Sequence, residues 1–472
     1  MSLSRNSFDV IVIGNGAIGL ACAFELIERQ PDLSIAIVGP DSRPRGASVA
    51  AGAMLGCHAE ITAHGLSNSL GREKFSWHRR AKTLWPNWLE RIIRGGSRVS
   101  VVEGTFVLCN AISGSLEDEN FAAIQHELGV DEIPHEHVDP RDVPGLRPTM
   151  DARAFRVVHI PDENAINALE YLGALERNLA EISSIALINE LAISLELKTN
   201  GSISGVKLRD GRELKGNQVL LAAGVGCQTL IEQCPPLRDR FPRIFAGVGT
   251  SLVAAQPREH ISNVLRTPNR SFSCGLHLVP RGENVYIGAT NTIRDELEML
   301  PRLVDVQFLL DSVIPQIAEP IHASLMLSMA TGSRPVSSDC FPLLGATPVP
   351  GLFIATGTFR DGIQLSPLLA QHIADVMLGG ENSFRNPFHP ERRPIWNLTI
   401  DDAVSLCTSH YLGVFYENGC HLPKVGWEDF LSEMLQKEVR EIYEPFGTEN
   451  LPPIDFVHLL RERKKRGVSG TL

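Results

Sequence analysis

Three glycines near the N-terminus have the spacing that binds the phosphates of a dinucleotide. Gly14, Gly16 and Gly19 form a Gly-x-Gly-x-x-Gly sequence, which follows the apolar run 10–13 and opens a segment with helical spacing of apolar residues. The first glycine permits a tight turn, the second lets a pyrophosphate approach the backbone, and the third lets helix and strand pack closely. The helix N-terminus offers free N–H groups to phosphate. The sequence therefore predicts a dinucleotide-binding strand–turn–helix unit.

The next strand lacks the acidic end that nicotinamide enzymes use to bind the adenosine ribose. We expect this strand over 34–38, where Gly39 takes the acidic position and Asp41 follows two residues later. Asp41 as a ribose partner and Asp41 as a turn residue both stay open.

The elements that must position this unit first alternate between strands and helices, and are followed by strands of a separate sheet. The stretch 219–224 reads as a buried strand ending in small residues at a turn, a second place where a phosphate or flavin can meet backbone. The stretch 99–108 reads as paired strands around Glu103 and Gly104. Further strands are expected over 185–197, 203–208, 245–255, 276–289 and 352–355, and helices over 67–94, 164–181 and 363–378.

Composition is typical of a soluble globular protein of two or more domains. The chain has 472 residues, 43% hydrophobic and 21% charged, and its net charge of −11 argues against a nucleic-acid partner. None of its nine cysteines forms a Cys-x-x-Cys pair, so we expect a cytoplasmic protein with neither disulfides nor a metal site. We also expect no membrane span and no signal peptide, because no apolar run is long enough and the first strand begins near residue 8.

Five segments, in this order, resemble the D-amino-acid oxidase and glycine oxidase superfamily of FAD-dependent amine oxidoreductases. The resemblance covers roughly residues 8–379 and is closest to the glycine-oxidase branch. The segments are 14–19, Ser-Val-Ala-Ala-Gly-Ala-Met-Leu at 48–55, 219–224, Leu-Val-Pro-Arg at 278–281 with 288–290, and Gly-Ser-Arg-Pro at 332–335 running on to 355–367.

The resemblance implies an α/β fold, with a Rossmann-like FAD-binding domain assembled from several segments. An α+β substrate domain built on an antiparallel sheet and a helical C-terminal extension complete it. We assign 1–85, 150–235 and 330–379 to the FAD-binding domain, 86–149 and 236–329 to the substrate domain, and 380–472 to the extension.

The resemblance also implies non-covalent FAD as the cofactor. Residues 48–54 and the backbone of 362–364 would flank the isoalloxazine ring. The residues expected to contact FAD are Gly14, Gly16, Ala17, Ile18, Gly19, Asp41, Ser48, Ala50, Ala51, Gly52, Met54, Leu191, Ala223, Gly224, Arg360, Asp361, Gly362, Ile363 and Gln364. Asp361 and Gln364 depart from the family's usual Asn and Leu.

Four side chains are implied as substrate contacts. Arg334 would clamp the substrate carboxylate, for which its planar fork of donors is suited, and Arg360 would lie nearby at the flavin edge. His277 replaces a tyrosine of glycine oxidase and Asn291 a pocket methionine. Structural readings stay open for each: an ion-paired or surface residue for the arginines, a core residue for His277 and a turn residue for Asn291.

These features predict a cytoplasmic FAD-dependent oxidase or dehydrogenase of an amino acid or small amine, primary or N-methylated. The cofactor accepts the hydride, so no protein acid or base is strictly required for catalysis. When protonated, His277 would add a third positive charge beside the two arginines, although these make its protonation harder, so we expect it to carry charge only when an anionic substrate is bound. This favours a substrate with a second polar or anionic group. An alternative is a flavin-bearing subunit of a complex, or a homo-oligomer, that docks through 380–472. A nicotinamide dehydrogenase is disfavoured, because segments 50–52 and 360–363 have no role in one.

Overall fold

The strand–turn–helix unit forms at the predicted residues. The computed structural model describes residues 6–44, 46–298, 300–381, 384–420, 422–423, 425–468 and 472. Strand β1 (Ser7–Ile13) leads through the glycine turn into helix α1 (Ala17–Arg29) and then into strand β2 (Ile35–Val38). The two strands pair in parallel, and both are buried over the apolar runs 10–13 and 35–38, as these runs predict.

The first sheet carries this unit at its centre. Its order is β18-β19-β11-β1-β2-β8, with β10 paired to β11 and β9 to β10. Val10 and Val12 face helices α1, α2, α4 and α7, whereas Ile11 and Ile13 face the opposite core beside α5. The other bounds are α2 Ser69–Ile93, α4 Ala168–Ala180, β8 Ile185–Ile188, β9 Ala192–Leu197, β10 Ile203–Leu208, β11 Glu213–Leu221, α5 Cys227–Gln233, β18 Leu343–Ala346, β19 Leu352–Thr356 and α7 Gly362–Leu378.

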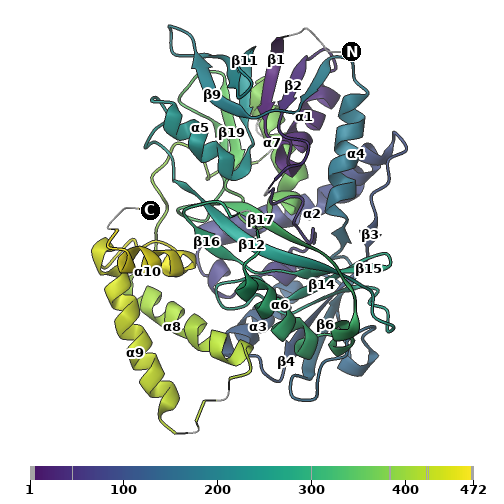
Figure 1. The fold of residues 1–472 in the computed structure, drawn as a ribbon, viewed down its shortest axis with the longest axis vertical. Helices are drawn as coiled ribbons and strands as arrows, with labels where there is room; N and C mark the ends of the chain where they lie inside the picture. The colour runs from purple at the N-terminus through teal and green to yellow at the C-terminus, as the bar shows by residue number, and fades with distance from the viewer. Residues whose placement is uncertain are drawn as a thin grey trace.

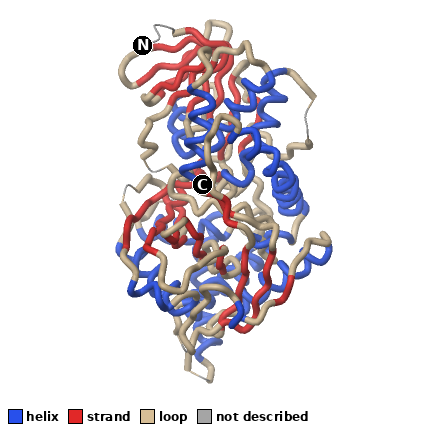
Figure 2. Tube along the Cα trace, turned by 90° about the vertical axis from the view of Figure 1, so that its right-hand side faces the viewer, coloured by secondary structure: helices blue, strands red, loops and turns tan. Residues whose placement is uncertain are grey.

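A second, largely antiparallel sheet lies below the first (Figure 1). Its order is β16-β12-β15-β14-β13-β4-β6-β5, with β17 paired to β12 over nearly its whole length. Helices α6 and α3 cover it. The bounds are β4 Thr105–Asn110, α3 Ser115–Val130, β5 Glu136–His137, β6 Ala154–Ile160, β12 Ile244–Ala255, β13 Val264–Arg266, β14 His277–Arg281, β15 Asn284–Gly288, β16 Thr292–Arg294, α6 Leu303–Gln316 and β17 Met326–Ser337. Seen from the side, the strands form two separate groups, the upper one beside the N-terminus (Figure 2).

The mixed α/β fold class is confirmed, but the two sheets divide the chain differently from the segments assigned above. Strand β6 and the larger part of β17, from residue 330 on, lie in the second sheet, although they fall in 150–235 and 330–379. The expected pairing within 99–108 is wrong. Strand β3 (Val101–Val102) pairs with β7 (Ala165–Ile166), and β4 pairs with β6 and β13. The Gly104 amide donates to the Asn164 side chain at 3.1 Å, so the turn directs β3 and β4 to different partners.

The C-terminal extension folds mainly as helices, as expected, and packs against one end of the second sheet (Figure 1). Its core surrounds Phe245, Ile293, Val336 and Phe359. Helices α8 (Ile400–Glu417) and α9 (Trp427–Tyr443) are followed by α10 (Val457–Lys465).

Short 3-10 turns complete the described chain: η1 His58–Glu60, η2 His64–Leu66, η3 Pro140–Asp142, η4 Gly224–Gly226, η5 Glu319–Ala323, η6 Glu444–Phe446 and η7 Ile454–Phe456. Within the described residues, every helix is too short or too polar to cross a bilayer.

Candidate active site

The glycine turn has the shape that a phosphate cradle requires. Gly14 has φ +119°, and a Cβ there would overlap the carbonyl of Ala222 on the strand beside it. A Cβ at Gly19 would overlap the carbonyl of Gly14. At Gly16 the nearest atom to a Cβ would be Ser48 Oγ at 3.3 Å. Gly14 and Gly19 are therefore required by packing within the protein, whereas Gly16 borders space that a larger side chain would fill.

The N-terminus of α1 is open towards that space. Gly16 is the extended N-cap, the first turn holds no acidic residue, and the Ala17 amide donates to Ser48 Oγ at 3.1 Å. Ile18 is half-buried there. Because Ile13 pairs with Leu221, the small residues Ala223 and Gly224 that follow β11 lie at the same sheet edge. Backbone donors and the helix dipole thus converge where the sequence predicts a pyrophosphate.

Two predicted contacts lie at the far end of this edge. Asp41 follows β2 and is exposed, and its amide donates to Asn189 Oδ1 at 3.1 Å. Leu191, 40% exposed, follows β8, the strand that pairs with β2. The structure thus brings the two loops together, and contact of either residue with a nucleotide stays a prediction.

The predicted flavin-flanking stretch 48–54 is held against the second sheet. The Ala50 carbonyl accepts hydrogen bonds from the Tyr286 hydroxyl at 2.9 Å and from Ser251 Oγ at 3.2 Å. The next carbonyl, that of Ala51, accepts from Arg281 at 2.8 Å. Ala53 has φ +55°, a conformation that side chains other than glycine rarely adopt, and Met54 pairs with Ala165. Hydrogen bonds therefore hold this stretch between the start of α1 and the second sheet.

The N-terminus of α7 approaches the start of α1. A Cβ at Gly362 would lie 3.7 Å from Ile18 Cδ1. Asp361 pairs with Lys74 at 2.7 Å, and although burial opposes ionisation, this pairing and nearby His78 hold the pKa of Asp361 well below its usual range. The side chain of Gln364 is buried and donates to the carbonyl of His78 at 3.0 Å. Gln364 is therefore tied to α2 by its side chain, and its carbonyl also accepts from the Trp85 indole at 2.9 Å. In the first turn of α7 it is the N–H groups of 362–364 that stay available to a cofactor.

Arg334 lies on β17 with its guanidinium over Gly249 of β12, where a Cβ would overlap Nη1. Nη1 donates to the Thr290 carbonyl at 3.1 Å and to Asn291 Oδ1 at 3.3 Å. Both hydrogen bonds that Arg334 makes to described side chains or backbone use Nη1, so Nε and Nη2 stay available for a carboxylate. The structure therefore brings Arg334 and Asn291 together, and Asn291 positions the arginine.

His277 lies beside the flavin-flanking stretch as a neutral ring. It is 3% exposed, stacks on Tyr286 at 5.7 Å, and its Nε2 would be 3.0 Å from a Cβ at Gly52. Nδ1 donates to the Gly275 carbonyl at 2.9 Å, which leaves a lone pair on Nε2. Burial, with Arg266 and Arg334, lowers the pKa of His277 to about 4, against the weaker effect of the Gly275 hydrogen bond. The ring is therefore neutral near neutral pH, and a positive charge on His277 in the presence of an anionic substrate stays a prediction.

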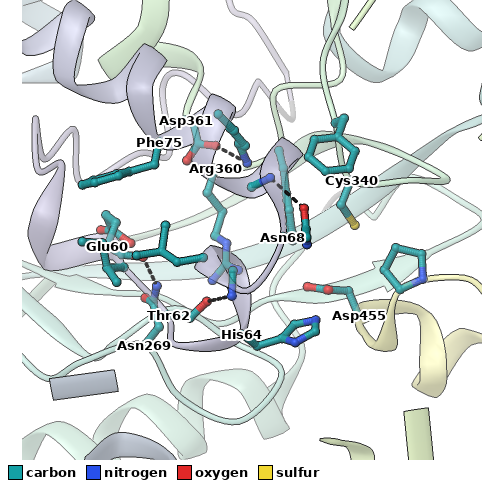
Figure 3. Close-up of a pocket in the computed structure, with 18 of the residues that line it drawn as sticks. Glu60, Thr62, His64, Asn68, Phe75, Asn269, Cys340, Arg360, Asp361 and Asp455 are labelled. Atoms are coloured by element: carbon teal, nitrogen blue, oxygen red, sulfur yellow. Dashed lines mark hydrogen bonds and ion pairs between the residues drawn. The ribbon is translucent and has the colours of Figure 1, made fainter. Parts of the chain in front are cut away.

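Arg360 points into a cavity of about 270 Å³ (Figure 3). Its guanidinium lies 4.7 Å from the Phe359 ring centre, and Nη1 is buried without a hydrogen-bond partner among the described residues. Glu60 and Asn269 line the same cavity and contact Arg266 behind the wall. Sequence reasoning missed these three, because Glu60 and Arg266 stand 206 residues apart and belong to no motif.

Comparison with known protein families gives an independent view of the chain. The model of the family described as "FAD dependent oxidoreductase" matches residues 9–376. Among curated proteins, the chain is 25% identical over 393 residues to the glycine oxidase of Geobacillus kaustophilus strain HTA426, covering 80% of this chain and 94% of that protein. It is 24% identical over 378 residues to the bifunctional protein ThiO/ThiG of Nostoc sp. PCC 7120, covering 78% of this chain. The chain spans only 52% of the length of that bifunctional relative.

Solved structures show the same fold. The crystal structure of glycine oxidase from Geobacillus kaustophilus superimposes with a TM-score of 0.70 at 23% identity, and the match covers 82% of this chain and 100% of that one. Iminodiacetate oxidase from Chelativorans sp. BNC1 gives a TM-score of 0.67 at 19% identity, covering 81% of this chain and 100% of that one. In both cases about a fifth of this chain is left without a counterpart.

Proposed function

Because the chain belongs to the FAD-dependent oxidoreductase family, we propose that it oxidises the C–N bond of an amino acid or a related small amine to an imine. When bound, FAD accepts the hydride from the substrate carbon, and oxygen or another acceptor then takes the electrons. Water hydrolyses the imine after release. An N-methyl amino acid fits this reaction as well as a primary amine does.

The residues present fit a non-covalent FAD. Gly16, Ala17 and Gly224 would hold the pyrophosphate, because the glycine turn leaves the required space at the N-terminus of α1, where the Ala17 amide is shared with Ser48 Oγ. The loops that carry Asp41 and Leu191 would hold the adenosine. The stretch 48–54 and the backbone of 362–364 would flank the isoalloxazine, since both meet between α1 and the second sheet.

The placement of Arg334 is the observation that carries the proposal. The Arg334 guanidinium lies next to Gly249 on the second sheet, held by Thr290 and Asn291 through one nitrogen. Two donor nitrogens can then bind a carboxylate as a fork, which fixes the direction of the neighbouring carbon. Neutral His277 can accept a hydrogen bond from the substrate amine at Nε2. These two side chains would orient the substrate carbon against the flavin.

Anaerobic titration of the purified protein tests this proposal. The yellow protein should lose its flavin absorbance near 450 nm when mixed with one or more members of a panel of primary and secondary amino acids. The released imine should appear as a keto or aldehyde product. Retention of full absorbance with every amine of the panel, together with bleaching by substrates that lack nitrogen, would reject oxidation of a C–N bond.

A partner subunit or second copy docking on 380–472 is supported by one feature of α9. Trp427, Phe430 and Met434 recur at helical spacing and are 50%, 58% and 48% exposed. The molecular mass in solution, measured for wild type and for a variant with Trp427 and Phe430 replaced by serine, tests this interface. A single-chain mass for the wild type would contradict docking of a second copy, and a single-chain mass also in extract of the source cells would contradict a partner subunit.

A cytoplasmic location is supported by the cysteines. All nine are free thiols, and seven are buried with neither a disulfide nor a thiol partner. Reduced cysteines of this kind are typical of a reducing compartment. Fractionation of the source cells, followed by detection of the protein in the cytosolic fraction, is the test.

A further inference from the structure

The cavity that receives Arg360 has walls from three parts of the chain. One wall comes from η1, η2 and α2, and a second from the segments 339–341 and 359–361. The third comes from the C-terminal extension, through 395–398 and 453–455. In Figure 3, Arg360 extends into the middle of the cavity, between Glu60 and Asn269 on one side and His64 and Asp455 on the other. The extension therefore closes a space that opens from the body of the enzyme.

Most charges of these walls are already neutralised by partners. Glu60 pairs with Arg266, Lys74 with Asp361 at 2.7 Å, and Asp339 with Arg392 at 2.9 Å. Arg360 and Asp455 are the charged lining residues without an ion pair among the described residues. A buried guanidinium nitrogen without an acceptor is costly, so such a group indicates a ligand or ordered water at that point. The cavity is large enough for either.

The cavity lies next to the predicted carboxylate clamp. The Phe359 amide donates to the Pro335 carbonyl at 2.9 Å, so the backbone that carries Arg360 runs beside the backbone that carries Arg334. The Phe359 ring reaches Gly247, and a Cβ at that glycine would be 3.2 Å from the ring and 3.3 Å from Asn291 Oδ1. The Phe359 ring thus lies close both to Asn291, the partner of Arg334, and to the guanidinium of Arg360, which is 4.7 Å from the ring centre.

We propose that this cavity is a subsite for a second carboxylate of the substrate, which Arg360 binds. The substrate class is an amino acid or secondary amine with an acidic group at the end remote from the carboxylate bound by Arg334. Asp455, on the extension, forms the opposite wall and repels a longer dianion, so that the extension limits substrate length. This inference rests on the proposed function, because it assigns the first carboxylate to Arg334.

Equilibrium binding of unreactive acids to the FAD-loaded full chain tests the subsite without turnover. Calorimetry would compare succinate with butyrate, and glutarate with pentanoate, so that each pair differs only in the second carboxylate. The measured quantity is the affinity ratio, the Kd of the monocarboxylate divided by the Kd of its matching dicarboxylate. One charge-assisted contact predicts an affinity ratio of roughly ten to one hundred. An affinity ratio near one in the wild type would overturn the proposal, whatever the variants do.

Three variants connect that ratio to the cavity. Arg360→Gln should bring it close to one, and Asp455→Asn should raise it several-fold by removing a repulsive charge. Arg393→Gln is the matched control, because Arg393 is exposed on the same extension and does not line the cavity. An equal loss in Arg360→Gln and Arg393→Gln, or an unchanged or lower ratio in Asp455→Asn, would contradict the assignment.

These outcomes are distinct from failure of the proposed function. If no amine bleaches the flavin but dicarboxylates bind tightly through Arg360, only the oxidation of a C–N bond is wrong. If amino acids bleach the flavin and the second carboxylate adds nothing to binding, only the subsite is wrong.

Discussion

Arg334 and Asn291, 43 residues apart, meet on the second sheet, where the guanidinium donates to the side-chain oxygen at 3.3 Å. The same nitrogen donates to the Thr290 carbonyl at 3.1 Å. Because β17 and β12 pair along almost their whole length, the arginine is fixed by a strand rather than a loop, and it lies over a glycine. A guanidinium held at one nitrogen keeps the orientation that recognition of a planar carboxylate needs.

Replacement of Arg334 by lysine should leave folding and FAD binding intact and should reduce kcat/KM for carboxylate substrates roughly tenfold to hundredfold. Lysine keeps the charge and loses the fork, so about 1.5–3 kcal/mol of one charge-assisted hydrogen bond is lost. Asn291→Ala is a milder control, because the Thr290 carbonyl still holds Nη1. Steady-state kinetics that match wild type in Arg334→Lys would show that the arginine has only a structural role.

A valine at Gly16 should give folded, colourless protein. Gly16 has φ −79°, which valine tolerates, and a Cβ meets nothing closer than Ser48 Oγ at 3.3 Å. The rest of the side chain would fill the space assigned to the pyrophosphate. Gly19→Ala is the contrasting variant, because its Cβ would overlap the Gly14 carbonyl and should destabilise the unit itself. Flavin absorbance per chain and circular dichroism separate the two effects, and a yellow Gly16→Val protein would contradict the cradle.

Local patterns in the sequence were sufficient to predict most elements of the first sheet. The glycine turn, α1 and the buried strand β11 each carry their signal within ten or so adjacent residues, as apolar runs, turn residues and helical spacing. The error at 99–108 has a different origin. Val101 and Val102 satisfy their hydrogen bonds with β7, more than sixty residues along the chain, and nothing near Gly104 indicates that partner.

The site divides in the same way. Arg334 stands in a recognisable segment, but its contact with Asn291 depends on the register of β17 against β12. The pKa of His277 could not be predicted, because it depends on complete burial and on the proximity of Arg266, which belongs to no motif. Glu60 and Asp455 reach the cavity of Arg360 from opposite ends of the chain. Single residues of this kind become visible only when tertiary packing is known.

Acid should destabilise the protein between about pH 6.5 and pH 4. Burial lowers the pKa of both His277 and His372 from 6.5 to about 4, so in this range the unfolded chain binds more protons than the folded one. The contribution of these two histidines to the free energy of unfolding is therefore fully present above pH 6.5. It falls as the pH drops towards 4, by up to about 1.4 kcal/mol per pH unit for each histidine. Glu417, whose pKa burial raises, contributes with the opposite sign.

Urea unfolding at pH 7, 6 and 5 measures this slope. His372→Gln isolates one histidine, since His372 lies on α7, 2% exposed, outside the residues assigned to substrate. In this variant the free energy of unfolding should fall less steeply with falling pH than in wild type. The difference corresponds to the uptake on unfolding of up to one proton fewer. An identical slope would show that His372 titrates normally. Substrate affinity should not change through His277 between pH 6 and 8, because the ring stays neutral there.

Loss of the C-terminal extension should make the protein aggregate. Leu398, Tyr411 and Phe456 share a core with Phe245, Val336 and Phe359, so a chain ending at Leu378 would expose the apolar end of the second sheet. Gel filtration and light scattering of that chain measure the effect. If it stays soluble, monodisperse and as active as wild type, the extension is dispensable.

Glu417 permits a finer test of the same dependence. Its buried carboxylate, 3% exposed at the end of α8, accepts hydrogen bonds from the Ser271 amide at 2.9 Å and from the Ser271 hydroxyl at 2.6 Å. It also lies close enough to the buried Arg270–Glu117 ion pair to feel both charges. Glu417→Ala would leave the Ser271 donors unpaired, and about 3–5 kcal/mol is the usual cost of breaking a buried charged network. Glu417→Gln keeps an acceptor oxygen and should lose less. Chemical unfolding of both variants gives the comparison, and equal stability of wild type and Glu417→Ala would show that α8 docks through its apolar contacts alone.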